Sequence, residues 1–228
     1  MINTFQKSII FGTFFISLFC GSLICTSLVT NHWIDSKPWR KANPSQSSGK
    51  INFGLLYGRK ELNVAFGLRP YEITVADMIQ KNESLMFWSL WFVTLFSISL
   101  SLVCSGLAAF LAVINSFITP SFAIFSITGI YFTNISSVLL CSIGMIAWTI
   151  EFRSQLYTNV LPKEDLENYW TSEGVTKLGF SFWLIAVSAV LHFFNVLLVK
   201  WSTLQDQKNH RKSLNSSTRK IAGAIMLY

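Results

Sequence analysis

The sequence predicts an all-α membrane protein: a bundle of four transmembrane helices with a small extracellular β-sheet in the first loop. No Asp, Glu, Lys or Arg occurs between Glu83 and Glu151, and a water-soluble domain could hardly keep so long an uncharged stretch. Two further uncharged stretches run from Ser8 to Ile34 and from Leu178 to Val199. Each can cross a bilayer once, since about 20 helical residues span a hydrocarbon core of about 30 Å. Charged residues are only 13% of the 228 residues, against about 25% in a typical soluble domain.

The central uncharged stretch is long enough for two crossings, with Pro120 at the turn between them. The whole chain, 1–228, is therefore expected to form one four-span membrane domain. The expected spans are residues 8–30, 85–115, 122–150 and 179–201. The expected connections are extracellular loops 31–84 and 151–178, and a cytoplasmic tail, 202–228.

A cleaved signal peptide at residues 9–29 is the alternative for the first span. That apolar run is longer than the roughly 7 to 15 residues of a signal sequence, and no Ala-x-Ala cleavage pattern follows it. Cleavage would leave three spans and place the termini on opposite sides.

The basic tail sets the expected orientation. After Trp201 it carries five Lys and Arg residues against the single acid Asp206, which favours both termini in the cytoplasm of a multi-pass protein of the plasma membrane. The tail either anchors the last helix in solvent or is attracted to anionic lipids of the inner leaflet. Six tryptophans near the span ends are expected to act as anchors at the membrane interface: Trp33, Trp88, Trp91, Trp148, Trp183 and Trp201.

Two rows of small residues are expected to hold the bundle together. They recur every four residues, as Thr13, Ser17, Gly21 and Cys25 in the first span and as Ser97, Ser101, Ser105 and Ala109 in the second. Such rows allow close helix approach in lipid, either within one bundle or between copies in an oligomer.

Polar residues are few inside the spans. His192 and Asn195 lie three residues apart on one face of the last helix, with no acidic residue in the spans to accompany them. A proton relay or ion path would need ionisable partners. The pair is therefore predicted to form a buried hydrogen-bonded clasp with a hydroxyl or amide of a neighbouring helix, and a transport role is the alternative.

The sequence contains no pattern typical of catalysis. Its three histidines lie far apart, and no His-Glu-x-x-His, Gly-x-Ser-x-Gly or glycine-rich phosphate loop occurs. All four cysteines fall within expected spans, without metal-binding spacing. We therefore expect no enzyme activity, cofactor, metal site or nucleic-acid partner; the expected partners are the lipid bilayer and other membrane proteins.

The first loop has segments of strand-like composition at Ile51–Tyr57 and Tyr71–Val75, and a helical segment is expected at Thr74–Gln80. With the rest of the chain, these features resemble the clarin family within the wider claudin-like group of four-span proteins. The resemblance rests on Trp33, Phe53–Gly58, Phe66–Pro70, Thr128–Tyr131, Ser181–Trp183, His192–Asn195 and Met226–Tyr228.

Claudins carry two cysteines in this loop after a Gly-Leu-Trp sequence. The first two clarins also carry cysteines in this loop, one of them directly before a Gly-Leu, where this chain has Phe66. The resemblance is therefore to clarins without loop cysteines. It implies a membrane scaffold that organises other membrane proteins and the actin cytoskeleton. An auxiliary channel subunit, or a small channel or junctional claudin-like protein, is the alternative.

Two short motifs predict modification or binding. Asn82-Glu83-Ser84 is a glycosylation sequon expected in the outer loop. The chain ends in the apolar sequence Met226-Leu227-Tyr228, which suits strand addition into the groove of a PDZ or cytoskeletal scaffold domain.

Overall fold

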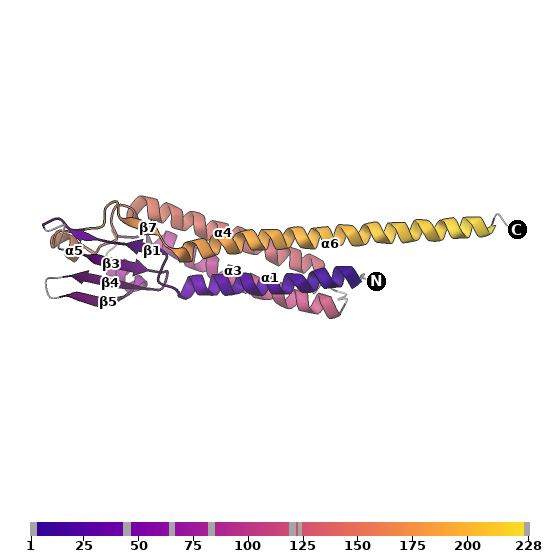
Figure 1. The fold of residues 1–228 in the computed structure, drawn as a ribbon, viewed down its shortest axis with the longest axis horizontal. Helices are drawn as coiled ribbons and strands as arrows, with labels where there is room; N and C mark the ends of the chain where they lie inside the picture. The colour runs from indigo at the N-terminus through magenta and orange to yellow at the C-terminus, as the bar shows by residue number, and fades with distance from the viewer. Residues whose placement is uncertain are drawn as a thin grey trace.

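The computed structural model describes residues 4–42, 47–63, 67–81, 85–118, 122 and 125–225. Its four long helices are α1 (Thr4–Val29), α3 (Trp88–Phe117), α4 (Ile127–Glu151) and α6 (Phe180–Ile225). Each is long and apolar enough to cross a membrane. They form one bundle, with a sheet at one end and the N- and C-terminal ends of the chain at the other (Figure 1). The predicted fold class, four membrane-spanning helices with a small sheet in the first loop, is confirmed.

The buried residues of all four helices recur at alternating steps of three and four. In α3 the residues that follow this spacing are Trp91, Thr94, Ile98, Ser101, Ser105, Ala108, Ala112 and Asn115, and in α6 they are Ser181, Ile185, Ser188, His192, Asn195, Val199 and Ser202; a few further buried residues flank them. An average step of 3.5 residues is the spacing of a left-handed coiled coil. The helices therefore pack as a coiled four-helix bundle, with α3 against α1 and α4, and α6 against the same two helices.

The prediction that the four small residues of α1 share one packed face is wrong for the last of them. Thr13 and Ser17 are buried, but Cys25 is exposed and Ile24 takes its place in the core. A step of four residues turns about 40° beyond a full circle, so a long row of such steps leaves the packed face. The α3 row, by contrast, is buried throughout.

Gly144 of α4 faces α3 at close range. A β-carbon there would lie 2.7 Å from Ile98 Cδ1 and 2.8 Å from Ser97 Oγ. We expect Gly144→Ala to lower the free energy of unfolding by about 1–2 kcal/mol because the Ile98 and Ser97 side chains must leave their packed positions or the helices must move apart. Gly106→Ala is the matched control, since nothing lies within 4 Å of a β-carbon at that helical position. Titration with SDS in mixed micelles measures both; equal stability of the two variants would contradict the close packing.

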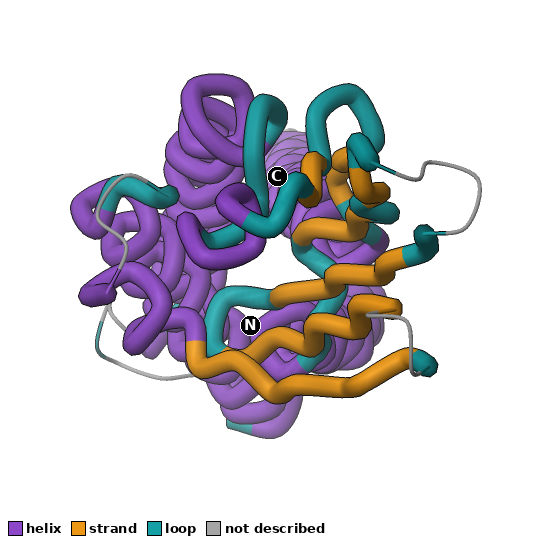
Figure 2. The backbone as a smooth tube through the Cα atoms, turned by 90° about the vertical axis from the view of Figure 1, so that its left-hand side faces the viewer, coloured by secondary structure: helices purple, strands orange, loops and turns teal. Residues whose placement is uncertain are grey.

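The sheet uses both loops of the chain. Its antiparallel order is β5 (Leu68–Thr74), β4 (Tyr57–Asn63), β3 (Gly49–Phe53), β1 (Ile34–Ser36) and β7 (Thr176–Leu178), and a second, two-stranded sheet pairs β2 (Trp39–Arg40) with β6 (Trp170–Thr171). Figure 2, viewed from this end, shows the strands over one part of the bundle. The strand expected at Ile51–Tyr57 is in fact two strands joined by a turn at residues 54–56. There the Gly54 N–H donates to the Tyr57 carbonyl (2.8 Å).

Short helices complete the sheet end. The helix expected at Thr74–Gln80 is present as α2 (Val75–Lys81). The π-helical turn η2 (Phe152–Leu156) extends α4, and α5 (Lys163–Glu167) precedes β6.

Three of the six tryptophans are not the interface anchors that the sequence predicts. Trp33, Trp91 and Trp148 are buried between the bundle and the sheet. The Trp33 indole donates to the Ser27 carbonyl and the Trp91 indole to the Leu55 carbonyl, each at 2.8 Å. These two rings satisfy their polar N–H groups inside the protein, which allows their large apolar surface to join the two layers. Trp88, Trp183 and Trp201 are exposed, as an anchoring role requires.

Helix α6 continues far beyond the span expected at 179–201 (Figure 1). No Gly or Pro interrupts residues 180–222, so nothing in this segment breaks the helix where it leaves the bundle. The basic tail is therefore a helical projection along most of its length.

Candidate functional site: a polar layer inside the bundle

One side-chain oxygen joins the two polar residues of the last span. The Asn134 Oδ1 atom of α4 lies 2.8 Å from His192 Nδ1 and accepts a hydrogen bond of 3.0 Å from Asn195 Nδ2. All three side chains are fully buried. The heptad steps of α4 and α6 bring these residues to the packed face at the same depth.

The contacts of Asn195 extend this layer to α1. The same Nδ2 lies 2.9 Å from Ser17 Oγ and 3.4 Å from the Thr13 carbonyl. Ser105 of α3 donates to the Ser17 carbonyl (2.8 Å). All four helices therefore meet in one hydrogen-bonded layer, and its amide and hydroxyl partners are of the kind that the sequence predicts for His192 and Asn195.

The hydrogen bonds assign the histidine tautomer. Asn134 donates through Nδ2 to the Ile130 carbonyl (2.8 Å), so its Oδ1 atom can only accept. His192 must therefore carry its proton on Nδ1, which leaves Nε2 as an acceptor. Neither His192 Nε2 nor Asn195 Oδ1 has a hydrogen-bond partner among the described residues. The layer is thus a neutral hydrogen-bonded network that contains two buried acceptors without donors.

Apolar clusters lie on both sides of this layer. Towards the sheet the core contains Ile24, Ile98, Cys141 and Ile185, and towards the termini it contains Ile10, Ala112, Ile130 and Val199. The polar groups are enclosed between these clusters. This arrangement suits a clasp that holds the helices together better than a continuous path for ions.

Glu151 is a buried polar residue that the sequence does not reveal. As the first charged residue after a long apolar stretch, it is expected at the start of the second loop, but it forms the last residue of α4 and is fully buried. Its Oε1 atom accepts a hydrogen bond from the Phe87 N–H (3.0 Å), immediately before α3. Oε2 has no partner, and no ion pair involves Glu151 among the described residues. Its carboxylate caps the start of a neighbouring helix.

Glutamine should replace this group well and leucine poorly. We expect Glu151→Gln to keep or raise stability, because it retains an acceptor for Phe87 and removes an unpaired charge, and Glu151→Leu to cost about 1 kcal/mol. Thermal unfolding of the purified protein in neutral detergent compares them. Equal losses in both variants would show that the charge, and not the acceptor, is what matters.

Several predicted residues lie outside the described residues: Asn82, Pro120, Met226, Leu227 and Tyr228. The four cysteines are free thiols, with Cys20 and Cys141 buried. Among the residues that the structure describes, no group of three or more His, Cys, Asp or Glu side chains could hold a metal ion.

Comparison with known proteins supports the resemblance seen in the sequence. No family model matches the chain. The chain is 28% identical over 226 residues to clarin-3 of Homo sapiens, and the match covers 95% of this chain and 97% of the human protein. The relative is the third clarin, in agreement with the absence of first-loop cysteines here. The chain is therefore similar to clarin-3 along almost the whole length of both proteins, in agreement with the resemblance to the clarin family and with the four-span fold.

Proposed function

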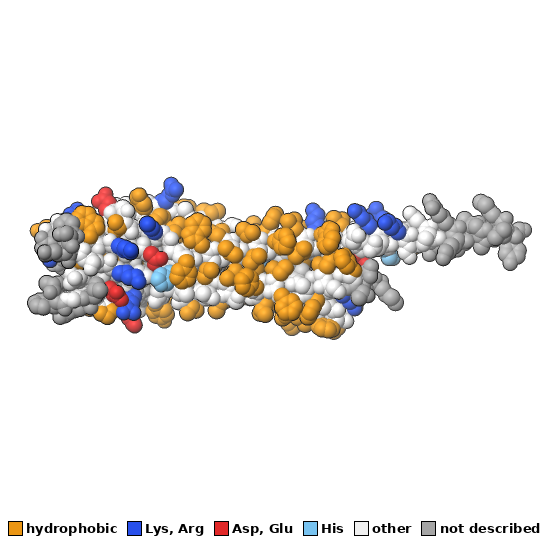
Figure 3. All heavy atoms as spheres, in the orientation of Figure 1, with side chains coloured by type: hydrophobic (Ala, Val, Ile, Leu, Met, Phe, Trp, Pro, Cys, Tyr) orange, Lys and Arg blue, Asp and Glu red, His pale blue; other side chains and the backbone are white. Residues whose placement is uncertain are grey.

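We propose that the protein is a non-enzymatic membrane organiser of the clarin type, which acts through lateral contacts in the plasma membrane and through cytoplasmic partners linked to actin. The proposal rests on two exposed surfaces that are available for contacts with other proteins. The bundle that bears them is held together internally by neutral hydrogen bonds. One surface faces the lipid along the helices, and the other is the projecting part of α6. Figure 3 shows apolar side chains over the bundle and basic ones along α6 where it leaves the bundle.

The lateral surface is rich in aromatic rings. On α3 the ring of Trp88 stacks on Phe92 (centroids 5.1 Å apart), and Phe92 stacks on Phe96 (6.1 Å). All three are exposed, with Phe96 58% exposed. A rigid ladder of rings offers a neighbouring membrane protein a large surface at little cost in side-chain entropy.

The projecting helix supplies the cytoplasmic surface. Beyond Trp201 it exposes Lys208, Arg211 and Lys212, and it ends near the apolar Met226-Leu227-Tyr228 motif. A stiff helix of this kind would hold that motif away from the membrane, where a PDZ domain of a scaffold protein could take the terminal carboxylate.

Proximity labelling in native membranes tests this proposal. A labelling enzyme fused at the N-terminus, on the same side as the tail, should mark junctional or channel proteins together with actin-linked scaffolds. The scaffolds alone should be lost when Tyr228 is deleted. Equal labelling by both forms would reject the PDZ contact, and protease protection that placed the two termini on opposite sides would reject the topology.

An auxiliary channel subunit, or a small channel, is the second candidate. The two unpaired buried acceptors of His192 and Asn195 favour it, because a permeating ion or water would use such groups. Conductance in planar bilayers that changes on His192→Leu would support the channel, and its absence would support the organiser.

We propose Asn82 as a glycosylation site on the strength of its sequon and of the sheet-bearing end on which loop 31–84 lies. Glycosidase treatment should shift the mobility of the wild-type protein but not that of Asn82→Gln. A shift that persists in the variant would exclude Asn82 as the acceptor.

A further inference from the structure

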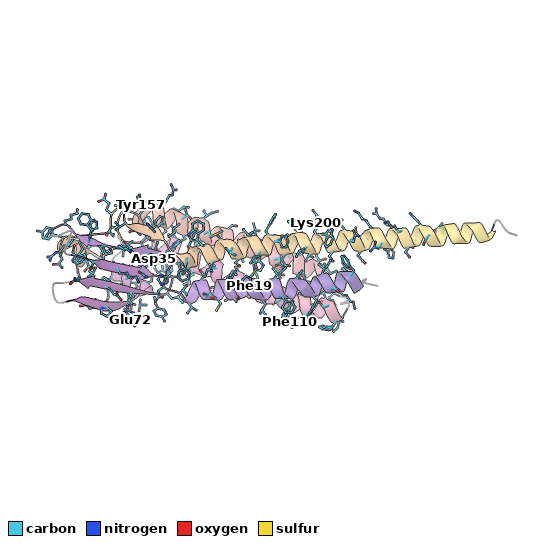
Figure 4. The ribbon with its side chains drawn as sticks, viewed as in Figure 1. Phe19, Asp35, Glu72, Phe110, Tyr157 and Lys200 are labelled. Carbon is cyan, nitrogen blue, oxygen red and sulfur yellow. The ribbon has the colours of Figure 1, made fainter. Side chains whose placement is uncertain are left out.

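A basic cavity opens where the sheet meets the helices. It has a volume of about 350 Å³ and is lined by His32, Asp35, Lys37, Lys50, Asn52 and Lys177, with Ser36 and Val175. Strand pairing explains this grouping, because Asp35 of β1 lies opposite Lys177 of β7 on one side and opposite Asn52 of β3 on the other. Figure 3 shows basic side chains beside a histidine at this junction, and Figure 4 labels Asp35 there.

The acidic groups near this cavity already have partners. Asp35 Oδ1 lies 2.7 Å from His32 Nδ1, and Glu61 pairs with Arg59 at 2.7 Å. Lys37, Lys50 and Lys177, by contrast, form no ion pair among the residues that the structure describes, and all three are exposed. The lining therefore carries three ammonium groups against the single carboxylate of Asp35, which leaves the cavity with a net positive charge.

The cavity lies close to the sheet-side ends of two apolar helices, where lipid headgroups are expected. His32 follows the end of α1 at Val29 by three residues, and Lys177 precedes the start of α6 at Phe180 by three. The His32 ring lies on the Phe180 ring, with centroids 4.8 Å apart. Trp183, less than one turn further into the span, is 58% exposed, as expected of a tryptophan at the membrane interface.

We propose that this cavity binds the anionic headgroup of a membrane lipid in the leaflet on the sheet-bearing side. The phosphate, sulfate or carboxylate of the headgroup would sit among the ammonium groups of Lys37, Lys50 and Lys177. The acyl chains would extend along the exposed rings of Phe180 and Trp183. A soluble anion shares the headgroup chemistry but lacks these apolar contacts, which is why the lipid is the ligand that fits. This site is on the opposite side of the membrane from the basic tail and does not depend on the organiser function.

The test uses the full-length protein in nanodiscs of phosphatidylcholine with a minority of either phosphatidylserine or sulfatide. Native mass spectrometry then counts the anionic lipids that remain bound. The triple variant Lys37→Gln, Lys50→Gln, Lys177→Gln should lose affinity for the anionic lipid by roughly 100-fold at low salt, since each basic group near a surface contributes about 1 kcal/mol. The control is Lys41→Gln, Lys81→Gln, Lys163→Gln, which removes the same charge from exposed positions of the same end outside the cavity.

The control variant should bind as the wild type does, and both triple variants should unfold at the wild-type temperature in phosphatidylcholine alone. Equal loss in the two triple variants, or no loss in either, would overturn the site. Inorganic phosphate or sulfate could also displace the bound lipid at the same concentration as a soluble headgroup does. That result would overturn the lipid as the ligand of this cavity.

Discussion

Gly179→Ala is expected to lower the free energy of unfolding by about 3 kcal/mol, the largest effect of a single methyl group in this protein. A β-carbon at Gly179 would overlap the carbonyl of His32 and lie 2.9 Å from Asp35 Oδ2. The obstacle is backbone, which no side-chain rotation can relieve. The same segment carries two backbone hydrogen bonds that join the start of α6 to the residues after α1, from Gly179 N to the Trp33 carbonyl (2.9 Å) and from Ser181 N to the His32 carbonyl (3.1 Å).

Unfolding in SDS and limited proteolysis of the loops measure this effect. Both loops should become sensitive to protease, because the sheet contains strands from each. The control is Gly12→Ala in α1, where a β-carbon meets nothing within 4 Å. A variant at Gly179 that unfolds at the wild-type midpoint with protected loops would show that the junction can open without cost.

Asn134→Leu is expected to cost about 2 kcal/mol. The change removes the shared oxygen, so the Nδ1–H of His192 loses its partner in a dry core while Asn195 keeps Ser17. Interhelical hydrogen bonds in membranes average about 0.6 kcal/mol each, and the unpaired donor accounts for the remainder.

A double-mutant cycle isolates the contact. Combined with His192→Leu, Asn134→Leu should cost less than the sum of the two single changes, because the second removes the donor that the first leaves unpaired. Thr133→Val is the matched control on α4, since its hydroxyl bonds only to carbonyls of its own helix, at Gly129 and Ile130. Strict additivity of Asn134 and His192 would argue that the observed 2.8 Å contact contributes nothing to stability.

The spans could be predicted because a bilayer imposes a simple rule on local sequence: long helices without charges. Burial could not be predicted in the same way. Trp33 and Trp88 both stand at span ends, yet only the first is enclosed, and the difference depends on whether the sheet covers it. The pairing of β7 with β1 joins residues about 140 positions apart, and no local pattern reports such a contact.

Only part of the polar layer could be predicted from the sequence. The spacing of His192 and Asn195 places them on one helix face, which predicts a shared neighbour. The identity of Asn134 as that neighbour depends on the packing of α4 against α6. Glu151 was hidden for another reason. A charged residue at the end of an apolar stretch usually lies at the boundary with water. Here the carboxylate of Glu151 is buried instead, because it accepts a hydrogen bond from the Phe87 N–H.

The neutral layer has a consequence for how the helices align along their length. Helix faces lined with serine, alanine and glycine have nearly the same shape at each successive heptad. Small residues alone would therefore allow α6 to shift along α4 by one heptad, or two turns, and still pack. A single amide oxygen that must meet both His192 and Asn195 permits only one of these alignments, as a buried asparagine does in coiled coils. Asn134 therefore fixes the register of α6 against α4. That register in turn sets the positions of the sheet-bearing loops and of the long projecting helix relative to the bilayer.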